Sequence, residues 1–235
     1  MLEEVRGLGY DVVQMPPYTI VYRRDIADLP ACIGARPHPG SETEVTGRSA
    51  IRVVEPGLVV RTLTHGGLLQ RITGSRFLTL GRSLRELEIS SFLLSQDVPT
   101  PIIAGLRFRK KGLFYYIEII SKLVPGSVDL LTHFEGRPDD ALPLLRSAGA
   151  LVRRLHDLGV YHFDLHVKNI LLDVNRTPWI IDLDNAYRFT SLPPVLKAKN
   201  LARFKRSLRK WDAKGRITLP HGWEQAFTGG YNSLS

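Results

Sequence analysis

The sequence predicts an α+β fold of two lobes that share a cleft, with a β-rich N-terminal lobe and a short, mainly helical C-terminal lobe. Two observations predict it: strand patterns with one helix come first along the chain, and helical patterns with one small hairpin follow. With 235 residues, 43% of them hydrophobic, the chain is long and apolar enough for such a core. The same composition excludes a disordered and a collagen-like chain.

The N-terminal half divides into two parts. Residues 1–45 give an irregular signal, because several prolines break any long helix, and we expect an N-terminal extension there. The N-terminal lobe should then run over 46–122 and the C-terminal lobe over 123–235. Between residues 47 and 63 apolar residues alternate around a Glu-Pro-Gly turn at 55–57, which predicts a β-hairpin.

The remaining elements follow from apolar periodicity. Leucines recurring on one face predict a helix over 82–95, and aromatic and β-branched residues predict a strand over 114–120. A second amphipathic pattern, over 145–155, predicts a helix that ends near residue 159. Two short apolar runs, 170–172 and 179–181, predict strands joined by a turn.

The segment Tyr161–Asn169 reads His-x-Asp-Leu-x-x-x-Asn, which is the form of a protein-kinase catalytic loop. Asp182 comes thirteen residues after Asn169, beyond the predicted strand pair. Antiparallel pairing should return Asp182 to the same edge as Asn169. An amide and a carboxylate side by side suit Mg²⁺ that also holds substrate phosphates, so both are candidate metal ligands.

Two further residues of this loop are candidates for catalysis. Asp164 lies five residues before Asn169 and can accept the proton of an attacking hydroxyl. Lys168, with His166 as a weaker candidate, can neutralise the transferring phosphoryl group. We expect His162 to hold the loop by hydrogen bonds. The alternative is that Asp164 and Asn169 only cap turns.

A phosphoryl-transfer site also needs a cation on the nucleotide phosphates, tied to an acid on a helix. The usual strand lysine is excluded because the first lysine of the chain is Lys110. Arg61 follows the apolar strand residues 58–60, and Glu86 in the predicted helix is its expected partner. Arginine binds phosphate in bidentate fashion, so the exchange is chemically acceptable. A surface arginine on an edge strand is the alternative.

A phosphate loop is less strongly indicated. Gly47 and Ser49 flank a point where a strand turns back, and the backbone N–H groups there could cover phosphates. Only one glycine is present, so a plain hairpin turn explains the same residues. Together these features assign nucleotide binding to residues 46–122 and catalysis to 123–235.

The net charge of +9 lies in one segment. Residues 188–216 hold ten basic residues and one acid, while the rest of the chain has 22 of each. Such a patch indicates an anionic partner. Leu201, Phe204, Leu208 and Trp211 recur on one helical face, which fits a helix docked on a core, a membrane-surface helix, or both.

No apolar run reaches the ~18–20 residues of a membrane span. The acidic start of the chain is unlike a secretory signal, so we expect a cytoplasmic protein. One cysteine, Cys32, excludes an intrachain disulfide framework and a cysteine-built zinc site.

From about residue 47 to its C-terminus the chain resembles the bacterial lipopolysaccharide-core kinases. The resemblance lies in Gly47-Arg48-Ser49, Val60-Arg61 followed by Gly66-Gly67-Leu68, Arg85-Glu86-Leu87, Val98-Pro99-Thr100-Pro101, Gly159-Val160-Tyr161-His162-Phe163-Asp164-Leu165, Asn169-Ile170-Leu171-Leu172, Ile181-Asp182-Leu183-Asp184, Asn200-Leu201 to Lys210, and Gly230-Tyr231. It implies a protein-kinase-like fold and ATP as phosphoryl donor. It also implies an acceptor hydroxyl, with O-4 expected, of 3-deoxy-D-manno-octulosonic acid (Kdo) on a lipid A precursor. The implied location is peripheral, at the cytoplasmic face of the inner membrane.

The residues agree with a compact acceptor. Only 53 residues follow Asp182 and no Ala-Pro-Glu triplet is among them, which argues against a peptide-binding lobe. We expect a lipid-linked anionic sugar and the membrane surface, through basic residues 197–216, as partners, with no nucleic acid and no obligate protein partner. The alternatives are a kinase of another core sugar such as heptose, a pseudokinase-like binding module, and an atypical protein kinase.

Overall fold

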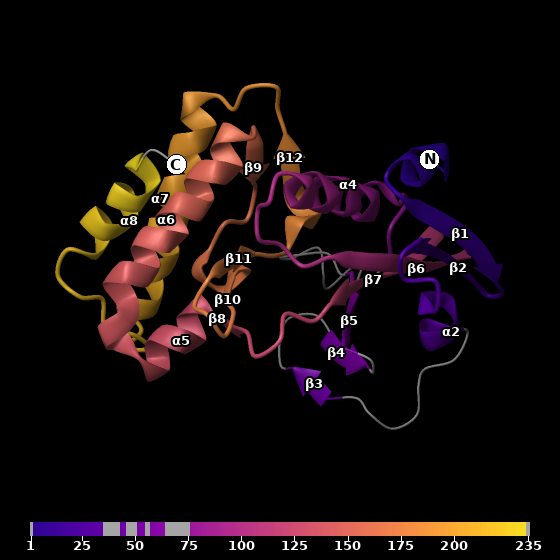
Figure 1. The fold of residues 1–235 in the computed structure, drawn as a ribbon, viewed down its shortest axis with the longest axis horizontal. Coiled ribbons are helices and arrows are strands. Elements are labelled where there is room, and N and C mark those ends of the chain that lie inside the picture. The colour runs from indigo at the N-terminus through magenta and orange to yellow at the C-terminus, as the bar shows by residue number, and fades with distance from the viewer. Residues whose placement is uncertain (1, 35–42, 46–50, 55–56, 64–75, 234–235) are drawn as a thin grey trace. The chain divides into compact units, whose positions relative to one another are not determined.

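The computed structural model describes residues 2–34, 43–45, 51–54, 57–63 and 76–233 (Figure 1). The chain forms two compact units, Met1–Ser91 with Pro101–Leu123, and Phe92–Thr100 with Val124–Ser235. No helix in the described ranges is long and apolar enough to cross a membrane.

The first unit is built on a seven-stranded antiparallel sheet with the order β1-β2-β6-β7-β5-β4-β3 (Figure 1). Its strands are β1 (Tyr10–Met15), β2 (Tyr18–Arg23), β3 (Thr43–Val45), β4 (Ile51–Val54), β5 (Leu58–Thr62), β6 (Ile103–Lys111) and β7 (Phe114–Lys122). Its helices are α1 (Leu2–Gly7), α2 (Leu29–Ile33) and most of α4 (Gly81–Ser95). The predicted hairpin, helix and strand of this half are thereby confirmed.

The expectation that residues 1–45 are irregular is wrong. Strands β1 and β2 pair with each other, and β2 also pairs with β6, where Ile20 lies opposite Arg107. Strand β2 is apolar on both faces, because Ile20 and Val21 are both buried but in different layers of the core. A strand buried on both faces lacks the alternation that identifies strands in a sequence.

Apolar layers cover both faces of the sheet. On one face Leu106 and Ile119 lie in a buried cluster with Leu87 of α4. On the other face Ile120 lies in a cluster with Leu29 of α2. Successive residues of β7 therefore enter opposite layers, as the two-residue repeat of a strand requires.

The second unit is mainly helical. Its helices are α5 (Leu130–Gly136), α6 (Ala141–Asp157), α7 (Pro194–Asp212) and α8 (Trp223–Asn232), and its strands are β8 (Val128–Asp129), β9 (Val160–His162), β10 (Ile170–Leu172), β11 (Pro178–Ile180) and β12 (Ala186–Arg188). Helices α6 and α8 approach so closely that a Cβ atom at Gly230 would overlap the carbonyl oxygen of Arg146. The predicted helix over 145–155 and the β10–β11 hairpin are confirmed.

Helix α7 docks by the predicted apolar face. Phe204 and Leu208 are completely buried, and the Phe204 ring stacks on Phe227 of α8 with centroids 4.7 Å apart. Trp211, at the end of the same stripe, is half-buried. The prediction of a docked helix is therefore confirmed, and contact with a membrane surface stays a proposal.

Candidate active site

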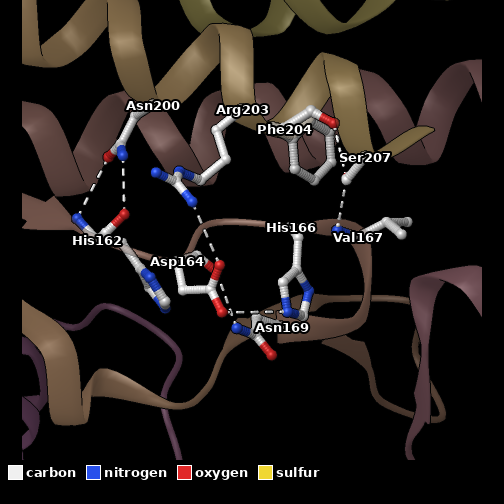
Figure 2. Close-up of polar contacts among 9 residues, drawn as sticks. All are labelled: His162, Asp164, His166, Val167, Asn169, Asn200, Arg203, Phe204 and Ser207. Atoms are coloured by element: carbon white, nitrogen blue, oxygen red, sulfur yellow. Dashed lines mark hydrogen bonds and ion pairs between the residues drawn. The ribbon is translucent and has the colours of Figure 1, made fainter. Parts of the chain in front are cut away.

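Helix α7 holds the predicted catalytic loop at three positions. Asn200, Arg203 and Ser207 point from one face of α7 toward the loop that links β9 to β10 (Figure 2). Two of these contacts reach the loop backbone: Asn200 bonds to His162, and Ser207 Oγ accepts the Val167 N–H at 3.0 Å. The path of the loop is thus fixed by a neighbouring helix.

The contact between Asn200 and His162 uses both ends of the amide. Asn200 Oδ1 accepts the His162 N–H at 3.2 Å, and Asn200 Nδ2 donates to the His162 carbonyl at 2.8 Å. The Asn200 side chain is only 1% exposed, so each bond forms away from water. Removing the amide would leave buried backbone groups unpaired.

This contact continues toward the C-terminus of the chain. His156 Nε2 lies 3.1 Å from Asn200 Oδ1, which can only accept, so Nε2 carries the proton. His156 Nδ1 must then accept from the Tyr231 hydroxyl, 2.9 Å away. Burial lowers the pKa of His156 to about 4, so this ring is neutral near pH 7.

The ring of His162 connects the loop to the predicted metal ligand Asp182. Its Nε2 donates to the carbonyl of Ile181 at 3.0 Å, which confirms the expected hydrogen-bonding role of His162. Asp182 follows with a left-handed backbone, φ 63° and ψ 56°. A positive φ at a non-glycine residue is uncommon and is often found at functional sites.

The structure brings Asn169 and Asp182 to the same end of the β10–β11 hairpin. Ile170 pairs with Ile180, and the Ile181 N–H donates to the Asn169 carbonyl at 3.1 Å. Asn169 Nδ2 donates to the Asp164 carbonyl at 3.0 Å, which fixes the amide so that its oxygen points away from Asp164 (Figure 2). Asp173 stabilises the turn between β10 and β11, because its carboxylate accepts two backbone N–H groups and the Trp179 indole N–H.

These donors fit Mg²⁺. An amide oxygen and a carboxylate are hard ligands, and Mg²⁺ is usually held by one or two such groups together with substrate phosphates. Within the described ranges no three His, Cys, Asp or Glu side chains are grouped as a closed protein cage would require. An amide and a carboxylate such as Asn169 and Asp182 suit a metal whose other ligands include a substrate phosphate.

The Asp164 carboxylate is accessible to solvent, with 52% of its side chain exposed. Arg203 lies 3.5 Å from Asp164 Oδ1, and His166 lies 3.7 Å from Asp164 Oδ2 (Figure 2). Burial lowers the pKa of His166, although the charge of Asp164 acts in the opposite direction. Arg203 is thus the permanent cation beside this carboxylate, and it can orient Asp164 for an incoming hydroxyl.

Sequence reasoning missed Asn200, Arg203 and Ser207 as site residues. Their spacing of three and four positions was visible as one helical face. What that face contacts was not visible, because the loop lies about forty residues earlier in the chain.

Lys168 is an exposed residue, and its Nζ lies 5.2 Å from the ring centroid of Trp211, near the end of α7. Its expected role on the transferring phosphoryl group stays a prediction.

The first unit carries the predicted cation and its partner. Arg61 on β5 donates from Nη2 to both carboxylate oxygens of Glu86 on α4, at 2.7 and 2.8 Å. Glu86 is 6% exposed and Arg61 is 21% exposed by side chain. The predicted pairing is confirmed, whereas Gly47 and Ser49 lie outside the described residues.

Comparison with known proteins shows which family the sequence of this chain matches. Residues 40–231 match the lipopolysaccharide kinase (Kdo/WaaP) family. A protein of Vibrio cholerae serotype O1 named 3-deoxy-D-manno-octulosonic acid kinase is 32% identical over 172 residues, which cover 70% of this chain and 72% of the relative. A protein of Xylella fastidiosa (strain M12) with the same name is 30% identical over 190 residues, which cover 77% and 74%.

A solved structure confirms the fold class. The structure described as WaaP in complex with acyl carrier protein matches with a TM-score of 0.56 and 18% identity, covering 89% of this chain and 82% of that chain. The predicted α+β, protein-kinase-like fold is confirmed, with a sheet-rich N-terminal unit and a mainly helical C-terminal unit. From its sequence match, the chain belongs to the lipopolysaccharide kinase (Kdo/WaaP) family and is thus a kinase.

Proposed function

We propose that this kinase transfers the γ-phosphoryl group of ATP to a hydroxyl of Kdo on a lipid A precursor, with O-4 as the hydroxyl to test first. The observation that carries the proposal is an exposed carboxylate, Asp164, on a loop whose backbone is fixed from α7. The names of relatives about 30% identical over most of the chain support Kdo as the acceptor sugar.

Asp164 is assigned the general base. It accepts the proton of the acceptor hydroxyl while that oxygen forms a bond to the γ-phosphorus and the bond from phosphorus to the ADP oxygen breaks. Arg203, 3.5 Å from the carboxylate, orients it, and the Asn200 and Ser207 contacts keep the loop at one position. The requirement on the protein is mainly positioning, as in other phosphoryl transfers.

Asn169 and Asp182 are assigned to Mg²⁺, and Arg61 with Glu86 to the nucleotide phosphates. Mg²⁺ bound there would neutralise charge on the transferring phosphate. Arg61 would contact the phosphates while Glu86 limits its motion through the paired hydrogen bonds. Lys168 is assigned to neutralising the charge of the transferring phosphoryl group, on the evidence of its place between Asp164 and Asn169.

We also propose that the enzyme works peripherally at the cytoplasmic face of the inner membrane, through basic residues 197–216. Several cations of this segment are engaged within the protein: Arg203 with Asp164, Lys205 and Arg209 with Glu224, and Arg216 with Glu135. The exposed remainder, which includes Lys199, Arg206, Lys210 and Lys214, supports attraction to anionic headgroups.

The test is transfer of labelled phosphate from ATP, with Mg²⁺, to Kdo-bearing lipid A precursor by wild type and Asp164→Asn. Label on the lipid that is lost in the variant supports the proposal, and mapping the phosphorylated position decides O-4. Asp182→Asn should raise the Mg²⁺ concentration needed for half-maximal rate. No label with ATP still bound would contradict Kdo as the acceptor and direct the search to heptose-bearing acceptors.

A further inference from the structure

Four cations surround one indole at the C-terminal end of α7. The ring centroid of Trp211 lies 5.2 Å from Lys168 Nζ, 5.4 Å from Lys210 Nζ, 5.3 Å from Lys214 Nζ and 5.6 Å from Arg216 Cζ. We refer to these five residues as the Trp211 cluster. All four cationic side chains are exposed, while the indole is half-buried.

The backbone holds this cluster together. Helix α7 ends at Asp212, and Gly215 takes a left-handed conformation, φ 66°, that reverses the chain. The Arg216 N–H then donates to the Trp211 carbonyl at 3.0 Å, and the Leu219 N–H donates to Asp212 Oδ1 at 3.0 Å. These bonds return residues 214 and 216 to the ring, so the cations are assembled before any ligand binds.

The cluster carries excess positive charge. Its four cations are bordered by two acids, Glu135, which pairs with Arg216 at 2.6 Å, and Asp212, so the local sum is 4 − 2 = +2. The indole face attracts each cation, but the cations repel one another. A bound anion relieves that repulsion, and a phosphate monoester, with about −1.5 to −2 charge near neutral pH, matches the sum.

One member of the cluster also belongs to the catalytic loop. Lys168 precedes Asn169 directly and lies four residues after Asp164, a stretch of at most ~14 Å even when extended. A phosphate held at the Trp211 cluster is therefore near a hydroxyl placed at Asp164. One acceptor can occupy both positions if it carries a phosphate a short distance from its reacting sugar.

We propose that the Trp211 cluster binds a phosphate group of the lipid-linked acceptor and thereby selects acceptors that carry an anchor phosphate. The proposal rests on the proposed function for the reacting sugar, but the phosphate site itself is defined by the cluster. A membrane surface alone would be served equally by any exposed cations of α7, whereas this site requires the four gathered at Trp211.

Vesicle binding tests the site without turnover. The full chain is measured on phosphatidylcholine vesicles that carry either phosphatidic acid, a phosphate monoester, or phosphatidylglycerol, a phosphodiester, at matched surface charge. The cluster variant is Lys210→Gln with Lys214→Gln, and the matched control is Lys199→Gln with Arg206→Gln, two exposed basic residues of α7 outside the cluster. Wild type and control should prefer phosphatidic acid by about tenfold, and the cluster variant should lose that preference.

Kinetics with the acceptor provides the second readout. The cluster variant should raise the KM for the phosphate-bearing acceptor about tenfold, with kcat and the KM for ATP unchanged. With the acceptor from which the anchor phosphate has been removed, the cluster variant should have the same KM as the control variant, which has lost the same number of exposed cations.

Three outcomes overturn the inference: equal vesicle preference in the two variants, an unchanged KM for the acceptor, or a raised KM for ATP, which would assign the cluster to the nucleotide. If wild type transfers no phosphate to the acceptor, the proposed function fails, and the vesicle result still decides the phosphate site.

Discussion

Helix α7 and the turn that follows it make two opposite kinds of contact. Asn200 and Ser207 are uncharged and bond to the backbone of the catalytic loop, with Asn200 completely buried. Lys210 and Lys214 are charged, exposed and gathered around Trp211. The first kind of contact fixes the shape of the loop, and the second leaves positive charge available to a ligand.

The energetic reason is the environment of each group. A buried neutral hydrogen bond costs about 1–3 kcal/mol when one partner is removed, because the other partner stays unpaired. An exposed charge pair contributes only about 0–1 kcal/mol, since water solvates either partner well. The comparison therefore predicts that substitutions in the neutral contacts reduce stability, while substitutions of exposed charges change activity or binding.

The largest effect is expected at Asp164, the exposed charge on the rigid loop. Asp164→Asn should lower kcat by about 10²–10⁴-fold, because the amide cannot accept the hydroxyl proton. Its free energy of unfolding should change by no more than about 0.5 kcal/mol, since the side chain is 52% exposed. Initial rates and urea unfolding check this, with Asp157→Asn, an exposed acid of α6, as control. A large loss of stability would show that Asp164 acts in folding.

The pair Arg61 and Glu86 in the first unit combines the two environments, because it is charged and yet largely buried. Arg61→Ala should cost about 2–3 kcal/mol of unfolding free energy. This is less than the 3–5 kcal/mol of a fully buried pair, because Arg61 is 21% exposed. It should also weaken ATP binding, measured by calorimetry.

The double variant Arg61→Met with Glu86→Leu separates the two roles of that pair. Apolar residues of similar size should restore most of the stability, since both charges of the pair are removed together. ATP binding should stay weak, because no cation replaces the guanidinium. Recovery of ATP binding together with stability would remove Arg61 from the phosphate site.

Much of this architecture was predictable because its signals are local. The loop Tyr161–Asn169, the hairpin that follows it and the long helices α4 and α6 each contain their own pattern within one segment. Arg61 and Glu86 were paired correctly because Arg61 directly follows the apolar strand residues 58–60 and Glu86 lies in a clear helical pattern.

The missed features depend on contacts between distant segments. Strand β2 was hidden because Ile20 and Val21 are both buried, which removes the alternation of apolar and polar residues. The hydrogen bonds from α7 to the loop could not be predicted, because nothing in the sequence distinguishes Asn200 from an ordinary polar residue until its partner His162 is known. The sequence predicted that the basic segment is one charged surface, whereas Arg203 and Arg209 pair with acids of the same unit.

An intermediate effect is expected at Asn200. Asn200→Ala removes both bonds to His162 and the partner of His156, so it should cost about 2–3 kcal/mol of unfolding free energy. The looser loop should lower kcat about tenfold with little change in the KM for ATP, since misplacement of a base affects the transition state most. Lys199→Ala, its exposed neighbour on α7, is the control. A variant that keeps full kcat and stability would show that the loop needs no support from α7.

The smallest effect is expected in the pH dependence of the unfolding free energy, through His156, which bonds to Asn200. The pKa of His156 is lowered from 6.5 to about 4 by burial, so the unfolded chain binds the proton more readily than the folded one. The contribution of His156 to stability is therefore complete above pH 6.5 and is lost as the pH falls toward 4. At pH 5.5 the loss should be about 1 kcal/mol.

His156→Gln isolates this contribution. A glutamine amide can donate to Asn200 Oδ1 and accept from the Tyr231 hydroxyl, as the neutral ring does, but it does not titrate. Urea unfolding at pH 7.5 and pH 5.5 should therefore show a pH-dependent loss about 1 kcal/mol smaller in the variant than in wild type. His166, whose pKa burial also lowers, is present in both proteins and cancels from the difference. An equal pH dependence in the two proteins would mean that His156 is protonated in the folded state, and then Nδ1 would donate to the Tyr231 oxygen and reverse that hydrogen bond.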